Sequence, residues 1–208
     1  MIDMNAACAI APDAATLRHH IAIEYERLAA APEQEFHFHT GREHAISRLR
    51  YDAASVDALP PETVRRFAGL GNPHRCGPIH QGETVLDVGC GAGMDLLLAA
   101  AAVGPRGRVI GVDATPAMLE VARRGTHEAG VAPRVELRLG RSDGLPLGDE
   151  SVDVVISNGG INLAPDKQAA MHELRRVLKP GGRLFLADAM ITGAFKQSEL
   201  ANPKLWAY

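Results

Sequence analysis

The residue types best suited to chemistry are concentrated in a glycine-rich turn that follows a short apolar run. Residues 85–88 are apolar except for Asp87, and the turn that follows contains Gly89, Gly91 and Gly93. Glycine lets the backbone approach a ligand where a Cβ would clash, and it permits positive φ. A carboxylate buried at the end of a strand is costly unless it has a partner. This combination predicts a polar, cationic ligand at a strand-to-helix turn.

Two further carboxylates follow the next two β-branched runs. Asp113 ends the run 108–112, and Asp143 stands in a turn just after the run 135–139. A carboxylate in the first position can accept hydrogen bonds from both hydroxyls of a ribose. A carboxylate in the second position can accept a hydrogen bond from an adenine amino group. The spacing therefore indicates a ligand that contains a nucleoside.

The elements that must position these residues alternate between strand and helix signals from residue 84 onward. Strands are expected at 84–88, 108–112, 135–139, 152–157 and 183–187, and helices near 94–103, from 116 to about 130, and over 166–178. Such alternation predicts parallel βαβ units in a doubly wound, mostly parallel α/β sheet of the Rossmann-like type. The segment 178–182 is expected to be a structural turn.

The first 80 residues have a different pattern. A helix is expected over 13–31, and a short one from Pro60-Pro61 to Gly69. We expect residues 1–80 to form a helical cap on the substrate side, and residues 81–208 to form the ligand-binding domain.

Composition narrows the class of protein. The chain has 22 basic and 25 acidic side chains, a net charge of -3 and no Lys/Arg-rich run, which argues against a nucleic-acid partner. The longest apolar stretch, 96–103, is too short to span a bilayer, and the N-terminus has no signal-peptide pattern. Cys8, Cys76 and Cys90 form no zinc-binding spacing, so a cytoplasmic protein without a metal site is expected.

The glycine pattern departs from the dinucleotide fingerprint G-x-G-x-x-G, because the chain has Met94 where that motif needs glycine. Four segments in order instead resemble class I S-adenosylmethionine-dependent methyltransferases: residues 85–93, 109–113, 151–158 and 178–184. The closer resemblance, through 156–167 and 103–105, is to the arsenite methyltransferase-like branch and its "type 11" relatives.

The resemblance implies that the cofactor is S-adenosyl-L-methionine, which leaves as S-adenosyl-L-homocysteine. Asp87 and the glycine loop would hold its methionine moiety, and Asp113 its ribose. Met118 and Asp143 would meet the adenine, and Asn158 would lie near the methyl group and the acceptor. The whole set implied for the cofactor is Asp87, Gly89, Cys90, Gly91, Gly93, Asp113, Ala114, Met118, Ser142, Asp143 and Asn158.

Each of these positions also has a purely structural interpretation. Asp113 could cap the helix that follows it, and Asp143 could be an ordinary turn residue. Met118 could belong to the core, and Cys90 is better explained as a small packing residue than as a nucleophile.

The sequence leaves the acceptor open. Arsenic-binding enzymes of the similar branch place a cysteine directly after the Ser-Asn pair, where this chain has Gly159. A thiophilic metalloid needs thiolate ligands, and only Cys76 and Cys8 remain as candidates for that role. Arsenite is therefore an alternative acceptor and not the leading one.

The segment 36–44 is the other candidate for the acceptor side, because it contains three histidines and two phenylalanines. His37 and His39 would share one face of an extended strand. With Asn158 they are the candidate catalytic residues, and we expect this segment to lie over the methyl group. Its alternative is a partly exposed cap segment whose histidines only form hydrogen bonds.

The leading hypothesis is a methyltransferase (EC 2.1.1.-) that acts on a small molecule by in-line transfer. Such a reaction mainly requires alignment and exclusion of water, and a base only when the acceptor is a hydroxyl or a protonated amine. The alternatives are an arsenite methyltransferase and a non-catalytic cofactor-binding homologue or partner subunit. An NAD-dependent oxidoreductase is disfavoured by Met94.

The end of the chain leads to an expectation about partners. Relatives have seven strands, whereas five are expected here, and the chain ends on the apolar residues 205–208. The sequence is then part of a longer chain, a short homologue, or a subunit whose sheet another subunit completes. A bare fifth strand would be an aggregation-prone edge. We therefore expect a homodimer or partner subunit across that edge, or a missing C-terminal portion.

Overall fold

A computed structural model describes residues 13–190 of the chain, and its centre is a five-stranded parallel sheet in the order β3-β2-β1-β4-β5. The strands are β1 (Thr84–Val88), β2 (Arg108–Asp113), β3 (Val135–Leu139), β4 (Val152–Asn158) and β5 (Leu178–Ala187). The strand order reverses between β1 and β4. Open α/β sheets bind ligands at such a point, outside the carboxyl ends of the strands.

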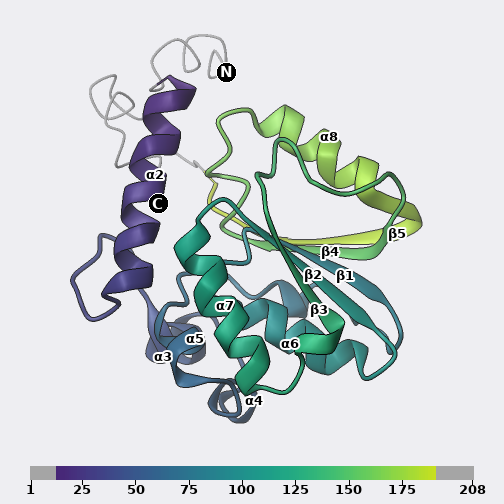
Figure 1. Cartoon of the computed structure of the whole chain (residues 1–208), viewed down its shortest axis with the longest axis horizontal. Coiled ribbons are helices and arrows are strands. Elements are labelled where there is room, and N and C mark those ends of the chain that lie inside the picture. Colours follow the sequence, from purple (N-terminus) through teal and green to yellow (C-terminus); the bar gives the residue numbers. More distant parts are fainter. Residues whose placement is uncertain (1–12, 191–208) are drawn as a thin grey trace.

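Helices cover both faces of the sheet (Figure 1). Helices α6 (Met94–Val103) and α7 (Pro116–Glu128) lie on one face, and α8 (Lys167–Val177) lies on the other. Val85 packs in the cluster on the α6 side, whereas Leu86 and Val88 pack in the cluster on the α8 side. Strands buried on both faces read as nearly continuous apolar runs, as β1 does.

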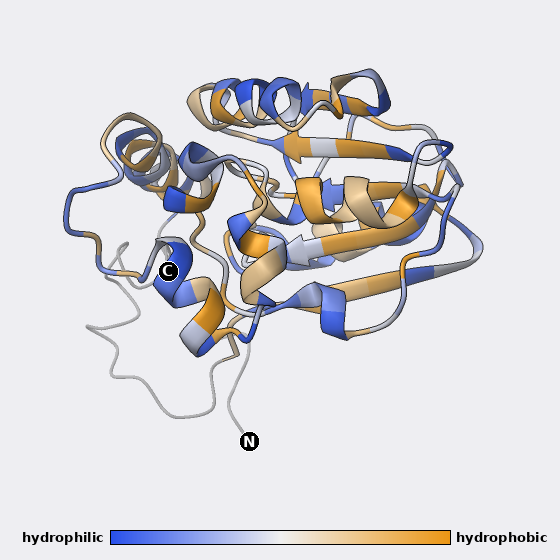
Figure 2. Ribbon diagram, turned by 90° about the horizontal axis from the view of Figure 1, so that it is seen from below, coloured by the Kyte–Doolittle hydropathy of each residue, from blue (hydrophilic) through white to orange (hydrophobic). Residues whose placement is uncertain are grey.

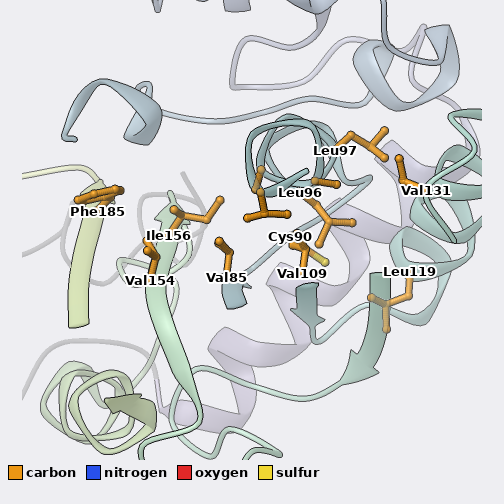
Figure 3. Packing of buried hydrophobic residues seen from close by; sticks show 13 residues of the cluster. Val85, Cys90, Leu96, Leu97, Val109, Leu119, Val131, Val154, Ile156 and Phe185 are labelled. Carbon is orange, nitrogen blue, oxygen red and sulfur yellow. The ribbon is translucent and has the colours of Figure 1, made fainter. Parts of the chain in front are cut away.

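The larger part of the core lies between the sheet and α6. Figure 3 shows Val85, Val109 and Ile156 of the strands on the side of α6 that carries Leu96, and Leu97 beside Val131. Figure 2 shows the strands of the sheet mainly in the colours of apolar residues. Burying one such side chain contributes about 1.5–3 kcal/mol, so this packing holds the carboxyl ends of the strands in fixed positions.

The N-terminal cap consists of short elements around one long helix. They are α2 (Ala14–Ala30), α3 (Gly41–Glu43), a π-helical turn (His44–Arg48), α4 (Ala53–Asp57), α5 (Pro61–Arg65) and a 3-10 turn (Pro73–Arg75). Asp13 caps α2 by accepting the N–H groups of Ala15 and Thr16, each at 3.0 Å. Helix α2 lies alongside α7 (Figure 1) and buries Leu28 completely.

The strand and helix expectations for the sheet are confirmed, with end points that differ by one or two residues in most cases. The exception is β5, which begins at Leu178 and not at Arg183, so the expected turn 178–182 is part of the strand. Leu178 pairs with Val152, and a register irregularity between Val152 and Val154 accommodates the extra residues. Sequence reasoning missed this bulge. In the cap, the second expected helix ends at Arg65, short of Gly69.

The expectations about the end of the chain fall on residues 191–208, which lie outside the described residues. Within the described part, β3 and β5 form the two edges of the sheet, and the expected partner at the β5 edge stays a prediction. None of the helices between residues 13 and 190 is long and apolar enough to cross a membrane.

Candidate functional site

A cavity of about 560 Å³ opens where the carboxyl ends of the central strands meet. Its volume falls in the range of small-molecule sites, about 300–1,000 Å³. Helix α2 forms one wall with Arg18, Ile21, Ala22 and Tyr25, whose spacing is that of one helical face. Sequence reasoning did not identify this wall, although the apolar periodicity of α2 was a signal that one of its faces had to be covered.

The glycine loop forms the floor of the cavity. All three of its glycines have positive φ, with a value of +51° at Gly91. A Cβ at Gly91 would meet no atom within 4 Å, because that position faces the open cavity. The loop therefore presents bare backbone to a ligand, and a side chain at Gly91 would occupy the ligand's space.

Asp87 lies beside this loop with an oxygen that has no partner. Its side chain is buried, and no hydrogen bond reaches Oδ2. Burial raises the pKa of Asp87 well above its usual value, and the nearby carboxylates of Asp95 and Asp113 raise it further. A buried carboxylate without a partner is costly, so this atom fits a cationic group such as the amino group of S-adenosylmethionine.

Asp113 joins the floor to the end of β2. Its Oδ2 accepts the N–H of Gly91 at 2.8 Å, and its Oδ1 accepts the N–H of Thr115 at 2.8 Å. Burial raises the pKa of Asp113, and these backbone hydrogen bonds oppose the rise. These contacts fix the carboxylate in place at the cavity wall, where it is an acceptor for a ribose hydroxyl.

Asp143 is less available than the sequence suggested. Its Oδ2 lies 2.7 Å from Nη2 of Arg18, and its Oδ1 lies 3.1 Å from Nε of Arg141. Burial raises the pKa of Asp143, but the two arginines outweigh this and hold it below its usual value. Asp143 therefore joins α2 to the loop after β3, and an adenine amino group would have to share it with Arg18.

Met118 and Cys90 contribute to the wall as packing residues as well. Met118 lines the cavity and also packs in the cluster that holds Leu28 and Phe38. Cys90 lines the cavity and is buried in the core on the α6 side. Burial raises the pKa of the Cys90 thiol, and Asp113 and Asp87 raise it further, so the thiol stays neutral.

Asn158 lines the cavity, but its polar atoms bind protein groups. Its Oδ1 accepts the N–H groups of Leu70 at 2.8 Å and Gly71 at 3.0 Å. Its Nδ2 lies 2.8 Å from the carbonyl of Gly71, 3.0 Å from Oδ2 of Asp95 and 3.0 Å from the hydroxyl of Tyr51. Sequence reasoning missed Asp95, although an acid in the first turn of α6 was visible in the chain.

All the residues implied for the cofactor line this one cavity, but neither His37 nor His39 does. The expectation that the segment 36–44 lies over the methyl group thus differs from the structure. Phe38 turns inward and stacks on Tyr25, with ring centroids 5.9 Å apart, and this leaves the histidines on either side of it exposed. The segment supports the cavity wall from behind, where Nε2 of His44 lies 2.8 Å from the carbonyl of Gly69.

Thiolate and metal chemistry find little support in residues 13–190. Cys76 is exposed and does not line the cavity, and Cys8 lies outside the described residues. In that same range, no three His, Cys, Asp or Glu side chains gather as a metal site.

Comparison with known proteins gives a consistent result. A family model described as a methyltransferase domain matches residues 79–207. The arsenite methyltransferase of Halobacterium salinarum is 46% identical over 156 residues, which cover 75% of this chain and 39% of that protein. The demethylmenaquinone methyltransferase of Symbiobacterium thermophilum is 40% identical over 108 residues, which cover 52% of this chain and 43% of that protein.

Among solved structures, an arsenic(III) S-adenosylmethionine methyltransferase from Chlamydomonas reinhardtii superimposes with a TM-score of 0.64 at 37% identity. The match covers 73% of this chain and 53% of that chain. The matched regions span about two-fifths of the length of the two curated relatives.

Proposed function

The chain belongs to the class I S-adenosylmethionine-dependent methyltransferase family, and from this premise we propose that it transfers a methyl group to a small-molecule acceptor. The observation that carries the proposal is the buried, unpartnered Oδ2 of Asp87 beside the bare backbone of the glycine loop. An oxygen in this state calls for a cationic ligand, and the family's cofactor has a cationic amino group and a sulfonium.

In this proposal the chain's own residues mainly bind the cofactor and align its methyl group with the acceptor. Asp87 pairs with the amino group, and Asp113, fixed by two backbone N–H groups, accepts from the ribose. Tyr25 and Phe67 close the cavity on the cap side and exclude water. The bound cofactor supplies an electrophilic methyl carbon on a good leaving group, so alignment provides most of the acceleration.

The acceptor that the wall favours is an apolar organic molecule. The lining residues left over after the cofactor residues are assigned include Phe67, Ala68, Leu163 and Pro165. A mainly apolar wall binds an acceptor through burial of its own apolar surface. The similarity to a demethylmenaquinone methyltransferase supports an acceptor of this kind.

Arsenite is the second candidate, and the arsenite methyltransferase relatives favour it. It needs soft thiolate ligands, but Gly159 has φ +74° and a Cβ there would lie 3.2 Å from Cγ of Leu70. A cysteine at this position would be strained and crowded. The raised pKa of Cys90 adds to the argument, because a neutral thiol is a poor ligand.

The test is methyl transfer by the 208-residue chain to a panel of thiols, amines, reduced naphthoquinones and arsenite with glutathione. Formation of S-adenosylhomocysteine is followed by mass spectrometry at limiting cofactor, and Asp87→Asn is the control with weakened cofactor binding and reduced turnover. We expect turnover with an apolar organic acceptor. Tight cofactor binding without turnover on any acceptor would instead support the non-catalytic homologue or partner subunit.

Three further expectations stay predictions. They are the division into a cap, residues 1–80, and a cofactor domain, residues 81–208, the homodimer or partner subunit at the β5 edge, and the cytoplasmic location. Analytical ultracentrifugation tests the second, and a monomer would contradict a homodimer.

A further inference from the structure

A buried set of polar side chains joins the cap to the cofactor floor beside the cavity. Asp95 in the first turn of α6 is 6% exposed. Its Oδ1 accepts the hydroxyl of Tyr51 at 2.7 Å and lies 3.1 Å from Nε2 of His74. Its Oδ2 accepts from Asn158 at 3.0 Å. We name Tyr51, Asp95 and Asn158 the polar clasp.

The polar clasp holds the end of a backbone segment whose first residues are held from the cap, where the N–H of Gly41 donates to the carbonyl of Phe67 and Nε2 of His44 lies 2.8 Å from the carbonyl of Gly69. The segment 67–71 runs between α5 and the 3-10 turn Pro73–Arg75 and belongs to neither a helix nor a strand. Asn158 accepts the N–H groups of Leu70 and Gly71 and donates to the carbonyl of Gly71. A side chain at the end of β4 thus takes the place of a strand partner for this segment.

The held segment is a wall of the cavity. Residues 67–69 line it, and Asn158 and Asp95 line it as well. The clasp therefore fixes the distance between the cap-side wall and the glycine loop, which is the space left for an acceptor.

Gly69 shows how closely the segment 67–71 approaches Asn158 at the end of β4. A Cβ at Gly69 would lie 2.6 Å from Cγ of Asn158 and closer still to its Nδ2. Gly69 does not have positive φ, so alanine is compatible with its backbone, and what forbids it is the approach of Asn158 and of Cζ of Phe67, which would also lie 2.6 Å from the Cβ. Glycine at this position is what lets the clasp close.

The protonation of Tyr51 suits its place in the clasp. Burial raises the pKa of Tyr51, and the carboxylate of Asp95 raises it further. The phenol stays neutral and keeps its proton for Asp95 at 2.7 Å or for the carbonyl of Gly71 at 3.1 Å, and its oxygen lies 3.0 Å from Nδ2 of Asn158.

We propose that the polar clasp positions the segment 67–71 as the acceptor-side wall of the cavity, so that Asn158 and Tyr51 align the acceptor without taking part in the chemistry. This inference rests on the proposed methyl transfer and deepens it. Misplacing a reacting group by about 1 Å can cost on the order of a hundredfold in rate. The clasp is built to prevent such a displacement.

The experiment compares Tyr51→Phe and Gly69→Ala with wild type and with Gly148→Ala, whose added Cβ would meet no atom within 4 Å. Hydrogen exchange is measured at the amides of Leu70 and Gly71. Affinity for S-adenosylhomocysteine is measured by calorimetry, and kcat and KM with the best acceptor of the panel. Because Tyr51→Phe adds no atom, it remains informative if Gly69→Ala fails to fold.

We expect both variants to exchange the two amides about tenfold faster, to keep cofactor affinity within about twofold and to lose roughly tenfold in kcat at unchanged KM for S-adenosylmethionine. Wild-type exchange rates in Tyr51→Phe would overturn the proposal. So would a loss of affinity for S-adenosylhomocysteine as large as the loss in kcat, since the clasp would then serve the cofactor.

Failure of the proposed function would look different. A wild-type chain that binds S-adenosylhomocysteine but methylates nothing in the panel refutes methyl transfer by this chain, and with it the alignment role. The exchange measurement then still reports whether the clasp holds the segment.

Discussion

The glycine-loop floor of the cavity and the N-terminal cap are each held in place by a different kind of contact. In the floor, Asp113 fixes the glycine loop through Gly91, which is 22 residues away, and the start of α7 through Thr115, which is two residues away. In the cap, Asn158 holds Leu70 across 88 residues, and Arg18 reaches Asp143 across 125. The floor is built on one turn that repeats a family pattern, whereas the cap combines apolar packing against α7 with hydrogen bonds between residues far apart in the sequence. We therefore expect the floor to set what donates the methyl group and the cap to set what receives it.

The largest expected effect tests whether the cap can loosen while the floor stays intact. Leu28→Ala empties a fully buried site between α2 and α7, and such changes lower the free energy of unfolding by about 2–5 kcal/mol. Ile23→Ala is the matched control, because Ile23 lies on the same helix and is 39% exposed. Hydrogen exchange should rise in α2 and stay slow in β1 and β4. Equal loss of protection in the sheet would mean that cap and floor unfold as one unit.

The second-largest expected effect tests whether Asp87, beside the glycine loop, binds the cofactor. Asp87→Asn keeps the shape of the side chain and removes its charge, so it should weaken binding of S-adenosylhomocysteine by about tenfold to a hundredfold, the value of a hydrogen bond to a charged group. Asp149→Asn is the control, since that carboxylate is 76% exposed and pairs with Arg176. If calorimetry gives the Asp87→Asn variant unchanged affinity for S-adenosylhomocysteine, the proposed role of the floor in cofactor binding is wrong.

The pH dependence of the free energy of unfolding tests whether Asp87 is buried as a proton-binding group in the ligand-free floor. The raised pKa of Asp87 comes from burial first and then from Asp95 and Asp113. The ligand-free folded chain therefore holds this proton more tightly than the unfolded chain, and its stability falls as pH rises through the folded pKa. Asp87→Asn should melt higher than wild type at alkaline pH, and the gap should close as pH falls. A gap independent of pH, measured by thermal scans, would show that Asp87 is not the titrating group.

The smallest effect tests the tie between α2 and the loop after β3. Arg18 is 42% exposed in its pair with Asp143, so Arg18→Ala should change affinity for S-adenosylhomocysteine by a factor that corresponds to at most about 1 kcal/mol. The effect should shrink at high salt. Arg124→Ala, an exposed arginine paired with Glu120, serves as the control. A loss of affinity as large as that of Asp87→Asn would show that α2 contributes to cofactor binding as much as the floor does.

The same contrast explains what the sequence could predict. Strand and helix periodicity and the glycine pattern are local, and they located the sheet, the loop and the residues from Asp87 to Asp143 that line the cavity. The start of β5 was missed because a bulge depends on pairing with Val152. His37 and His39 were misplaced because their direction is set by Phe38, which stacks on Tyr25. No local pattern shows that Asn158 binds Leu70 or that Tyr51 binds Asp95.

The most direct test of the central claim is calorimetric titration of the wild-type chain with S-adenosylhomocysteine and, separately, with NAD. We predict one S-adenosylhomocysteine bound per chain with micromolar or tighter affinity, displaced by S-adenosylmethionine, and no binding of NAD. Binding of NAD in its place, or no binding of S-adenosylhomocysteine by a folded chain, would contradict the assignment of the cavity.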